Sequence, residues 1–304
     1  MEILNMFFQL ILLLIFAPFF DGYARKIRAK YQSRIGVPIY QTYLDLYKLI
    51  SRYRTMPDFS NPIFIIVPFL LFALSATMFC ALPIMYNGEI LSKFSNIFVI
   101  LYLGAFFRFV FAIAGVDSAN PFAGIGSSRE VMMGIYVEPV IILSLCVIMF
   151  GTGSSSLIEI KNSILKGDFG YFTPSFAISC IAFAWAMYIE LGRKPYDLAE
   201  AEQELQEAVL SEYSGRDLAL IQISMIIKQF TMIGFLLILF LPFNFSNPFI
   251  NGICFILLAG ILYILAIFID NFSARFKIAN SVNFSIAIAL IIAFIATLLF
   301  ILGV

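Results

Sequence analysis

Eight long runs of apolar residues follow one another along the chain, and polar segments separate them. The runs cover residues 3–20, 62–84, 95–114, 131–150, 173–190, 219–242, 249–270 and 281–302. A helix needs about 20 apolar residues to cross a hydrocarbon core of about 30 Å, and these runs match that length. The pattern predicts an all-α polytopic membrane protein with about eight transmembrane helices, organised as a single membrane domain over residues 1–304.

Lys and Arg residues are distributed unevenly between these runs. Loops on one side of the predicted membrane hold 14 of the 19, whereas the alternate loops hold only Lys93, Lys161 and Lys166. Basic loops of bacterial membrane proteins face the cytoplasm. The distribution therefore predicts a multi-pass protein of the cell inner (cytoplasmic) membrane, with both termini on the periplasmic side.

Two of the basic loops, about 21–61 and 191–218, are too long to be simple turns. The first contains apolar residues that alternate with polar ones at helical spacing: Tyr40, Tyr43, Leu44, Tyr47 and Ile50. This pattern is typical of a helix that lies at the membrane surface or docks a partner.

The second long loop is acidic. If it forms a helix, Asp197, Glu200, Glu204 and Glu207 share one stripe. Carboxylates this close raise one another's pKa and can accept protons near neutral pH. A run of this kind is more often a solvated face, and the spacing alone leaves both interpretations open.

Composition adds what the chain does not contain. It is 62% hydrophobic and 12% charged, with no net charge, which is typical of a membrane protein and unlike a nucleic-acid-binding protein. It has no histidine, and its four cysteines stand singly in apolar runs. We therefore expect it to bind no metal or iron–sulfur cluster, so that any redox centre belongs to a partner subunit.

Six charged residues lie in or at the ends of the apolar runs: Arg108, Glu130, Glu138, Glu190, Lys228 and Asp270. Each costs about 2.5–3.5 kcal/mol at mid-membrane, so each needs a partner, water or a function. Lys228 and Asp270 are equally well explained as charges that reach the interface or form a buried ion pair. Glu138 lies seven residues into its run, just before Pro139, and is the strongest functional candidate.

Three segments carry a resemblance to a known family. Residues 190–215, ELGRKPYDLAEAEQELQEAVLSEYSG, closely resemble the signature of the complex I subunit 1 family. Residues 24–50 and 117–139 resemble its hydrogenase branch, the membrane proteins of hydrogenase-4 (component C) and formate hydrogenlyase. Val37 before Pro38, and Asn120 before Pro121, are small departures from that pattern.

The resemblance implies a subunit that connects a cytoplasmic redox arm to other membrane subunits. Its expected partners are a hydrogenase large subunit and a small iron–sulfur subunit, which hold the nickel–iron and iron–sulfur centres, and antiporter-like membrane subunits. The residues expected in proton movement are Glu130, Glu138, Glu190, Asp197, Glu200, Glu202, Glu207 and Asp270. Those expected to dock partners are Arg25, Arg28, Arg34, Asp45, Lys48, Arg129, Glu212 and Tyr213.

The leading hypothesis is a non-catalytic membrane subunit of a formate- or ferredoxin-linked hydrogenase complex that contributes to proton translocation. One alternative is the quinone-site subunit of a complex I-like NADH/quinone oxidoreductase. Hydrogenase relatives pass electrons to protons instead, which leaves quinone binding open. A stand-alone secondary transporter is a third hypothesis, disfavoured because the chain shows no internal repeat.

Overall fold

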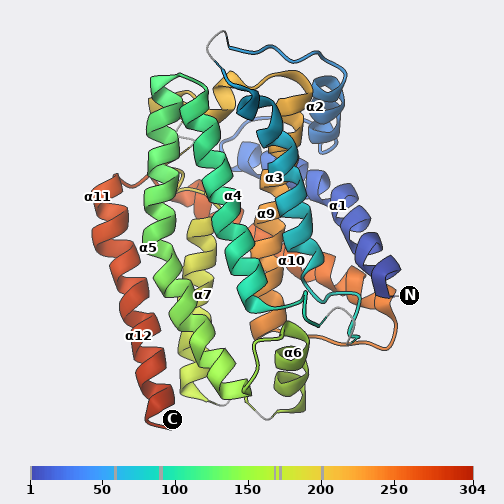
Figure 1. Ribbon diagram of the computed structural model, residues 1–304, viewed down its shortest axis with the longest axis vertical. Helices are drawn as coiled ribbons and strands as arrows, with labels where there is room; N and C mark the ends of the chain where they lie inside the picture. Colours follow the sequence, from blue (N-terminus) through green and yellow to red (C-terminus); the bar gives the residue numbers. More distant parts are fainter. Residues whose placement is uncertain are drawn as a thin grey trace.

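The computed structural model is a bundle of long, mostly upright helices (Figure 1). It describes residues 2–57, 60–88, 92–167, 169–170, 173–199 and 202–303, without the side chains of residues 202 and 203. The long helices are α1 (Glu2–Tyr31), α3 (Pro62–Cys80), α4 (Ile97–Asp117), α5 (Pro121–Thr152), α9 (Gly215–Phe240), α10 (Pro248–Phe272) and the segment Ile278–Ile301. Together with the shorter apolar helix α7 (Pro174–Glu190), they confirm the predicted polytopic membrane fold.

The last of these segments has three parts: α11 (Ile278–Asn280), the π-helical turn η3 (Ser281–Ile286) and α12 (Ala287–Ile301). Short helices close the two ends of the bundle. One end, called the α2 end here, carries α2 (Gln41–Ile50), α8 (Glu202–Leu205) and η2 (Ala208–Glu212). The opposite end carries α6 (Leu157–Lys166) and is called the α6 end (Figure 1).

Several helices begin at the same kind of dipeptide. Asn or Thr followed by Pro starts α3, α5, α7 and α10. Proline suits the first helical turn because its missing N–H has no partner there, and its fixed φ is already helical. Before α5, the Asn120 side chain also accepts from the Phe122 N–H at 2.9 Å. Gly153 ends α5 at φ 70°, a left-handed conformation that glycine adopts without a Cβ clash.

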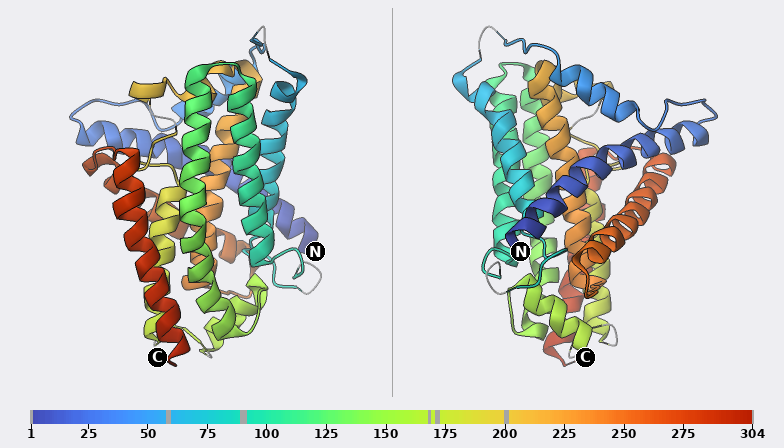
Figure 2. Two further views of the ribbon diagram at one scale, coloured as in Figure 1. Left: turned by 60° about the vertical axis from the view of Figure 1, so that its left-hand side comes forward. Right: turned by 90° about the vertical axis from the view of Figure 1, so that its right-hand side faces the viewer.

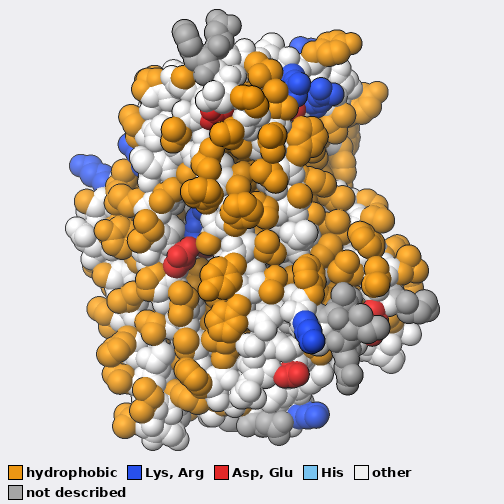
Figure 3. Space-filling view, in the orientation of Figure 1, with side chains coloured by type: hydrophobic (Ala, Val, Ile, Leu, Met, Phe, Trp, Pro, Cys, Tyr) orange, Lys and Arg blue, Asp and Glu red, His pale blue; other side chains and the backbone are white. Residues whose placement is uncertain are grey.

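Helix α9 runs through the middle of the bundle and packs against α3, α7, α10, α2 and α1. Its aromatic side chains build much of the core: Phe235 meets Phe183 of α7 edge-on at 5.4 Å, and Phe230 stacks on Tyr263 of α10 at 5.1 Å. Helices α1 and α10 lean across the others on one side (Figure 2). The outer face is mostly apolar, as a lipid-facing surface requires (Figure 3).

At the α6 end, Lys161 of α6 is buried among apolar residues. Its ammonium donates to the Pro83 carbonyl at 3.2 Å and to Asn87 Oδ1 at 3.1 Å, and burial lowers its pKa to about 8. These two bonds hold α6 against the segment that follows α3. The lysine therefore acts as a clasp at this end of the bundle.

Two predicted boundaries differ from the structure. Helix α1 continues to Tyr31 beyond the predicted end at residue 20, and α5 begins at Pro121 ahead of the predicted start at 131. Both extensions are polar, so hydropathy alone misses them; they leave the apolar zone as continuous helix. The acidic helix over residues 197–207 is wrong, since within its described part only Glu202–Leu205 is α-helical. Asp197 and Glu207 lie outside that turn, so no single carboxylate stripe forms.

Candidate functional site

Five charged side chains from four helices converge inside the bundle. We call Arg108 (α4), Glu130 and Glu138 (α5), Glu190 (α7) and Lys228 (α9) the central cluster. Arg108 donates to both Glu138 and Glu190. The Lys228 Nζ lies 3.2 Å from Glu190 Oε2 and 3.5 Å from Glu130 Oε1. The cluster thus forms one chain of ion pairs in the order Glu138, Arg108, Glu190, Lys228, Glu130.

Glu190 is the centre of this chain. Its side chain is only 7% exposed, and each of its two oxygens faces a different cation. Removing one partner of a buried ion pair costs about 3–5 kcal/mol, because the other charge stays buried without compensation. Glu190 therefore links α4 and α9 to the end of α7, where the acidic loop begins.

Small cavities connect the central cluster to that loop. One, of about 60 Å³, is lined by Glu130, Glu190, Lys228 and also by Tyr196 and Asp197 of the loop. A second, of about 30 Å³, lies between Glu130, Glu190 and Tyr196. Both are large enough for water and carry several polar partners for it. Proton exchange between Asp197 and the cluster needs no large opening.

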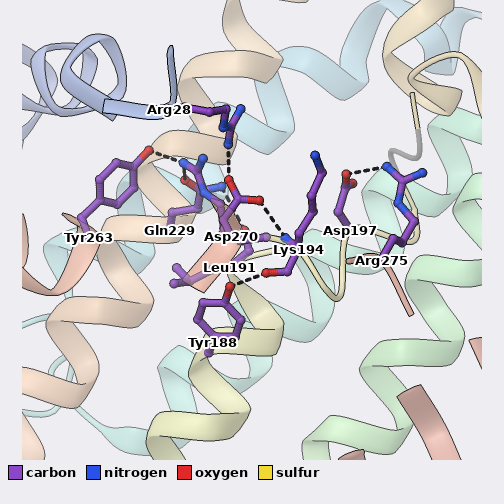
Figure 4. A network of polar contacts seen from close by, with 10 residues as sticks. Arg28, Tyr188, Leu191, Lys194, Asp197, Gln229, Tyr263, Asp270 and Arg275 are labelled. Atoms are coloured by element: carbon purple, nitrogen blue, oxygen red, sulfur yellow. Dashed lines mark hydrogen bonds and ion pairs between the residues drawn. The ribbon is translucent and has the colours of Figure 1, made fainter. Parts of the chain in front are cut away.

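The loop itself, residues 191–199, is fixed by Asp270 at the end of α10 (Figure 4). Asp270 is 4% exposed. It accepts from Arg28 of α1 and, through Oδ1, from the Lys194 N–H at 3.3 Å. One carboxylate therefore joins α1, α10 and the loop.

Further contacts hold both halves of the loop. Arg193 donates to Tyr263 and to Gln229 Oε1 at 3.1 Å, and Tyr188 donates to the Lys194 carbonyl. Arg275 pairs with Asp197 at 2.9 Å (Figure 4). Asp197 thus has a cation on one side and the water-sized cavity on the other.

With this geometry in place, similarity to known proteins can be assessed. Residues 4–301 match the family model described as NADH dehydrogenase. The chain belongs to this NADH dehydrogenase family. Hydrogenase-4 component C of Escherichia coli (strain K12) is 38% identical to it over 86% of this chain and 82% of its own length. Formate hydrogenlyase subunit 4 of the same organism is 36% identical over 83% of this chain and 82% of its own.

Other members are more distant. An NADH-quinone oxidoreductase membrane protein of Campylobacter curvus (strain 525.92) is 32% identical over 63% of this chain and 62% of its own length. Among solved structures, a chain of the membrane-bound sulfane sulfur reductase, described as an archaeal respiratory membrane complex, has the same fold. It aligns with a TM-score of 0.83 and 24% identity over 96% of this chain and 98% of that one.

Within this NADH dehydrogenase fold, the predicted proton residues separate into two groups. Glu130, Glu138 and Glu190 meet in the central cluster, and Asp197 borders it through the small cavity. Asp270 lies apart and anchors the loop, and Glu207 is exposed. Glu200 and the side chain of Glu202 lie outside the described residues.

The predicted docking residues also separate. Arg34 and Lys48 are exposed, and Arg25 pairs with Asp45 at the surface next to α2. By contrast, Arg28 binds the buried Asp270, and Tyr213 is buried and stacked on Phe64. Arg129 contacts Glu204, and Glu212 accepts from Asn120, so both hold the loop to α5. The Arg129 guanidinium also keeps the pKa of the Glu204 carboxyl below its ordinary value. The exposed apolar residues of α2 form a separate surface: Tyr40, Leu44, Tyr47 and Ile50.

Arg108 and Lys228 are the functional residues that the sequence reasoning passed over. Each is a lone cation in an apolar run, and that cost was the available signal. Which carboxylates they meet depends on how four helices pack, which hydropathy does not encode.

Gly134 provides a steric test of the cluster. A Cβ at this position of α5 would lie 2.6 Å from Arg108 Nε and 2.9 Å from its Cδ and Cζ. Gly134→Ala is therefore expected to displace the guanidinium from its two carboxylates and to lower stability by about 1–3 kcal/mol, the usual cost of overpacking. Thermal unfolding of the complex measures this.

Gly170→Ala is the matched control for Gly134→Ala. A Cβ there meets nothing nearer than the Ile164 methyl at 3.5 Å, an ordinary contact. We expect its melting temperature to equal that of the wild type. If Gly134→Ala also melts at the wild-type temperature, Arg108 is not held as tightly as the structure indicates.

Proposed function

We propose that this chain is the integral membrane subunit of a membrane-bound nickel–iron hydrogenase complex of the hydrogenase-4 or formate hydrogenlyase type. The support is its similarity to two such Escherichia coli proteins, which exceeds its similarity to the NADH-quinone oxidoreductase protein. In this role the chain is not itself catalytic. The nickel–iron and iron–sulfur centres belong to its partners, and no quinone is required.

The complex lies in the inner membrane with its redox arm at the α2 end. The basic residues gather at that end, which supports a cytoplasmic position for it and a periplasmic one for both termini. The exposed apolar face of α2, with Arg34 and Lys48 nearby, supplies a surface for the hydrogenase large subunit and the small iron–sulfur subunit. The chain thereby anchors the arm to the membrane.

The chain also contributes to proton coupling, and the central cluster is the observation that carries this role. When Glu190 takes up a proton, its attraction for Arg108 and Lys228 weakens. Arg108 still has Glu138, and Lys228 still has Glu130. The chain of pairs can therefore pass a proton without leaving a cation unpaired in a low-dielectric interior. A change of charge near Asp197, at the redox arm, reaches Glu190 across the water-sized cavity.

Glu138→Gln tests this coupling at the outer end of the chain. The amide still accepts a hydrogen bond from Arg108 but carries no proton, so proton movement coupled to hydrogen evolution should fall by at least about tenfold. The measurement is proton translocation by membrane vesicles, with hydrogen evolution and copurification of the nickel- and iron-containing subunits followed in parallel.

Glu159→Gln is the control for Glu138→Gln, since Glu159 is an exposed carboxylate of α6 outside the cluster. It should leave coupling unchanged. Unchanged coupling in Glu138→Gln would remove that residue from the pathway. Purification of the chain without nickel- and iron-containing partners would refute the hydrogenase assignment as a whole.

The quinone-linked alternative is distinguished by its substrate. It is favoured only by the more distant relative, the NADH-quinone oxidoreductase protein of Campylobacter curvus. Quinone-dependent turnover of the purified complex, sensitive to quinone-site inhibitors, would replace the hydrogenase proposal with this one.

A further inference from the structure

The face between α4 and α5 is hollowed along its length. Towards the α6 end, a cavity of about 620 Å³ opens between the two helices, with Met232 and Phe235 of α9 among its lining residues. Towards the α2 end, a second hollow of about 420 Å³ lies between Val116 of α4 and Ile135 and Tyr136 of α5. Because α4 and α5 form an antiparallel hairpin, the two hollows follow one groove.

Charge is exposed in the middle of this groove. Figure 3 shows acidic and basic groups between α4 and α5 at mid-height, surrounded by apolar side chains. The Glu138 side chain lines the larger cavity and is 40% exposed. A charged group that faces lipid at mid-membrane is costly, and a carboxylate is too short to reach the interface from there. This face therefore needs a covering that satisfies Glu138.

The sign of the charge narrows the covering. The central cluster holds three carboxylates and two cations, and Glu138 has only Arg108 as an ion-pair partner among the described residues. A lipid tail can fill an apolar hollow but donates no hydrogen bond. A polypeptide side chain that donates one at this depth satisfies the free carboxylate oxygen.

The groove also allows a helix to approach closely. Residues with small side chains line it: Gly104, Ala105, Ala112, Gly124, Ser127 and Ser128. A Cβ on Gly124 would meet nothing within 4 Å, and one on Gly104 only the tip of Met78. Small residues let the backbones of transmembrane helices come together.

We propose that a transmembrane helix of another membrane subunit lies in the α4–α5 groove and donates a hydrogen bond to Glu138 at mid-membrane. The proposal rests on the proposed function insofar as the chain is one subunit of a membrane complex. It assigns the lateral contact to this face and not to α10 or α12, and it extends the chain of ion pairs into the neighbouring subunit.

Photo-crosslinking of the assembled complex tests the position of this helix. Tyr102 and Phe150 border the larger cavity and are 75% and 72% exposed. With p-benzoylphenylalanine at either position, illumination should attach the chain to the same membrane subunit. Phe294 on α12 is the control, and it should not give that product. Adducts with phospholipid alone, or the same product from Phe294, would overturn the proposal.

Gly124→Leu tests the fit independently. The new side chain enters open space in this chain but occupies the groove. We expect the crosslinked membrane subunit to be lost on purification while the nickel- and iron-containing subunits remain. Retention of every subunit, or loss of all of them, would contradict the proposal. A crosslinked membrane partner in a complex that lacks hydrogenase activity would refute the proposed function and leave the groove assignment intact.

Discussion

Glu190→Gln is expected to lower the free energy of unfolding by about 3–5 kcal/mol and to abolish coupled proton movement. The neutral amide leaves Arg108 and Lys228 with one carboxylate each, in place of the shared Glu190. The two cations then repel each other in a region where Lys228 is 10% and Arg108 11% exposed. Thermal unfolding of the complex and proton translocation in vesicles measure the two effects.

A second substitution separates structure from function. In Glu190→Gln combined with Lys228→Met, the buried charge is balanced again, and replacing a buried pair by apolar groups is often neutral in stability. Most of the lost stability should return, whereas proton coupling should stay absent because no titrating group remains at the centre. Recovery of coupling together with stability would mean that Glu190 has only a structural role.

Asp270→Ala is expected to free the loop 191–199 from the bundle and to lower stability by about 2–4 kcal/mol. It removes a charged acceptor from Arg28 and another bond from the Lys194 amide, each worth up to about 1.5–3 kcal/mol. Amide hydrogen exchange over the loop should accelerate, and coupling should fall because Asp197 no longer stays beside the cluster.

Asp270→Asn gives an intermediate test, since its amide oxygen still accepts from Lys194 while the charge that holds Arg28 is gone. Loop exchange should lie between the wild type and Asp270→Ala. Asp45→Asn is the control, because its pair with Arg25 is at the surface and worth about 0–1 kcal/mol. Wild-type exchange rates in Asp270→Ala would show that other contacts suffice to hold the loop.

The fold was predictable because its signal is local. An apolar run of membrane length specifies a spanning helix whatever surrounds it, and the predicted spans match α3, α4, α7 and α10 closely. Helices α1 and α5 were underestimated because their polar ends remain helical outside the apolar zone, where hydropathy gives no guidance.

The candidate site was predictable only in part. The cost of a charge in lipid identified Glu138 and Glu190, but the pairing of Glu190 with two cations depends on α4, α7 and α9 meeting at one point. The acidic loop was misjudged because the i, i+3, i+7 spacing presupposes a helix. Contacts to Asp270 and to Tyr263 hold the chain in an irregular path instead.

Pro18 gives α1 a mechanical property. It stands inside the helix and supplies no N–H to the preceding turn, so bending is easiest at this point. Arg28 lies ten residues beyond it, a lever arm of about 15 Å. A swing of about 10° would therefore carry the guanidinium roughly 3 Å, enough to part it from Asp270. A subunit pressing on this rod could release the latch on the loop without touching the loop itself.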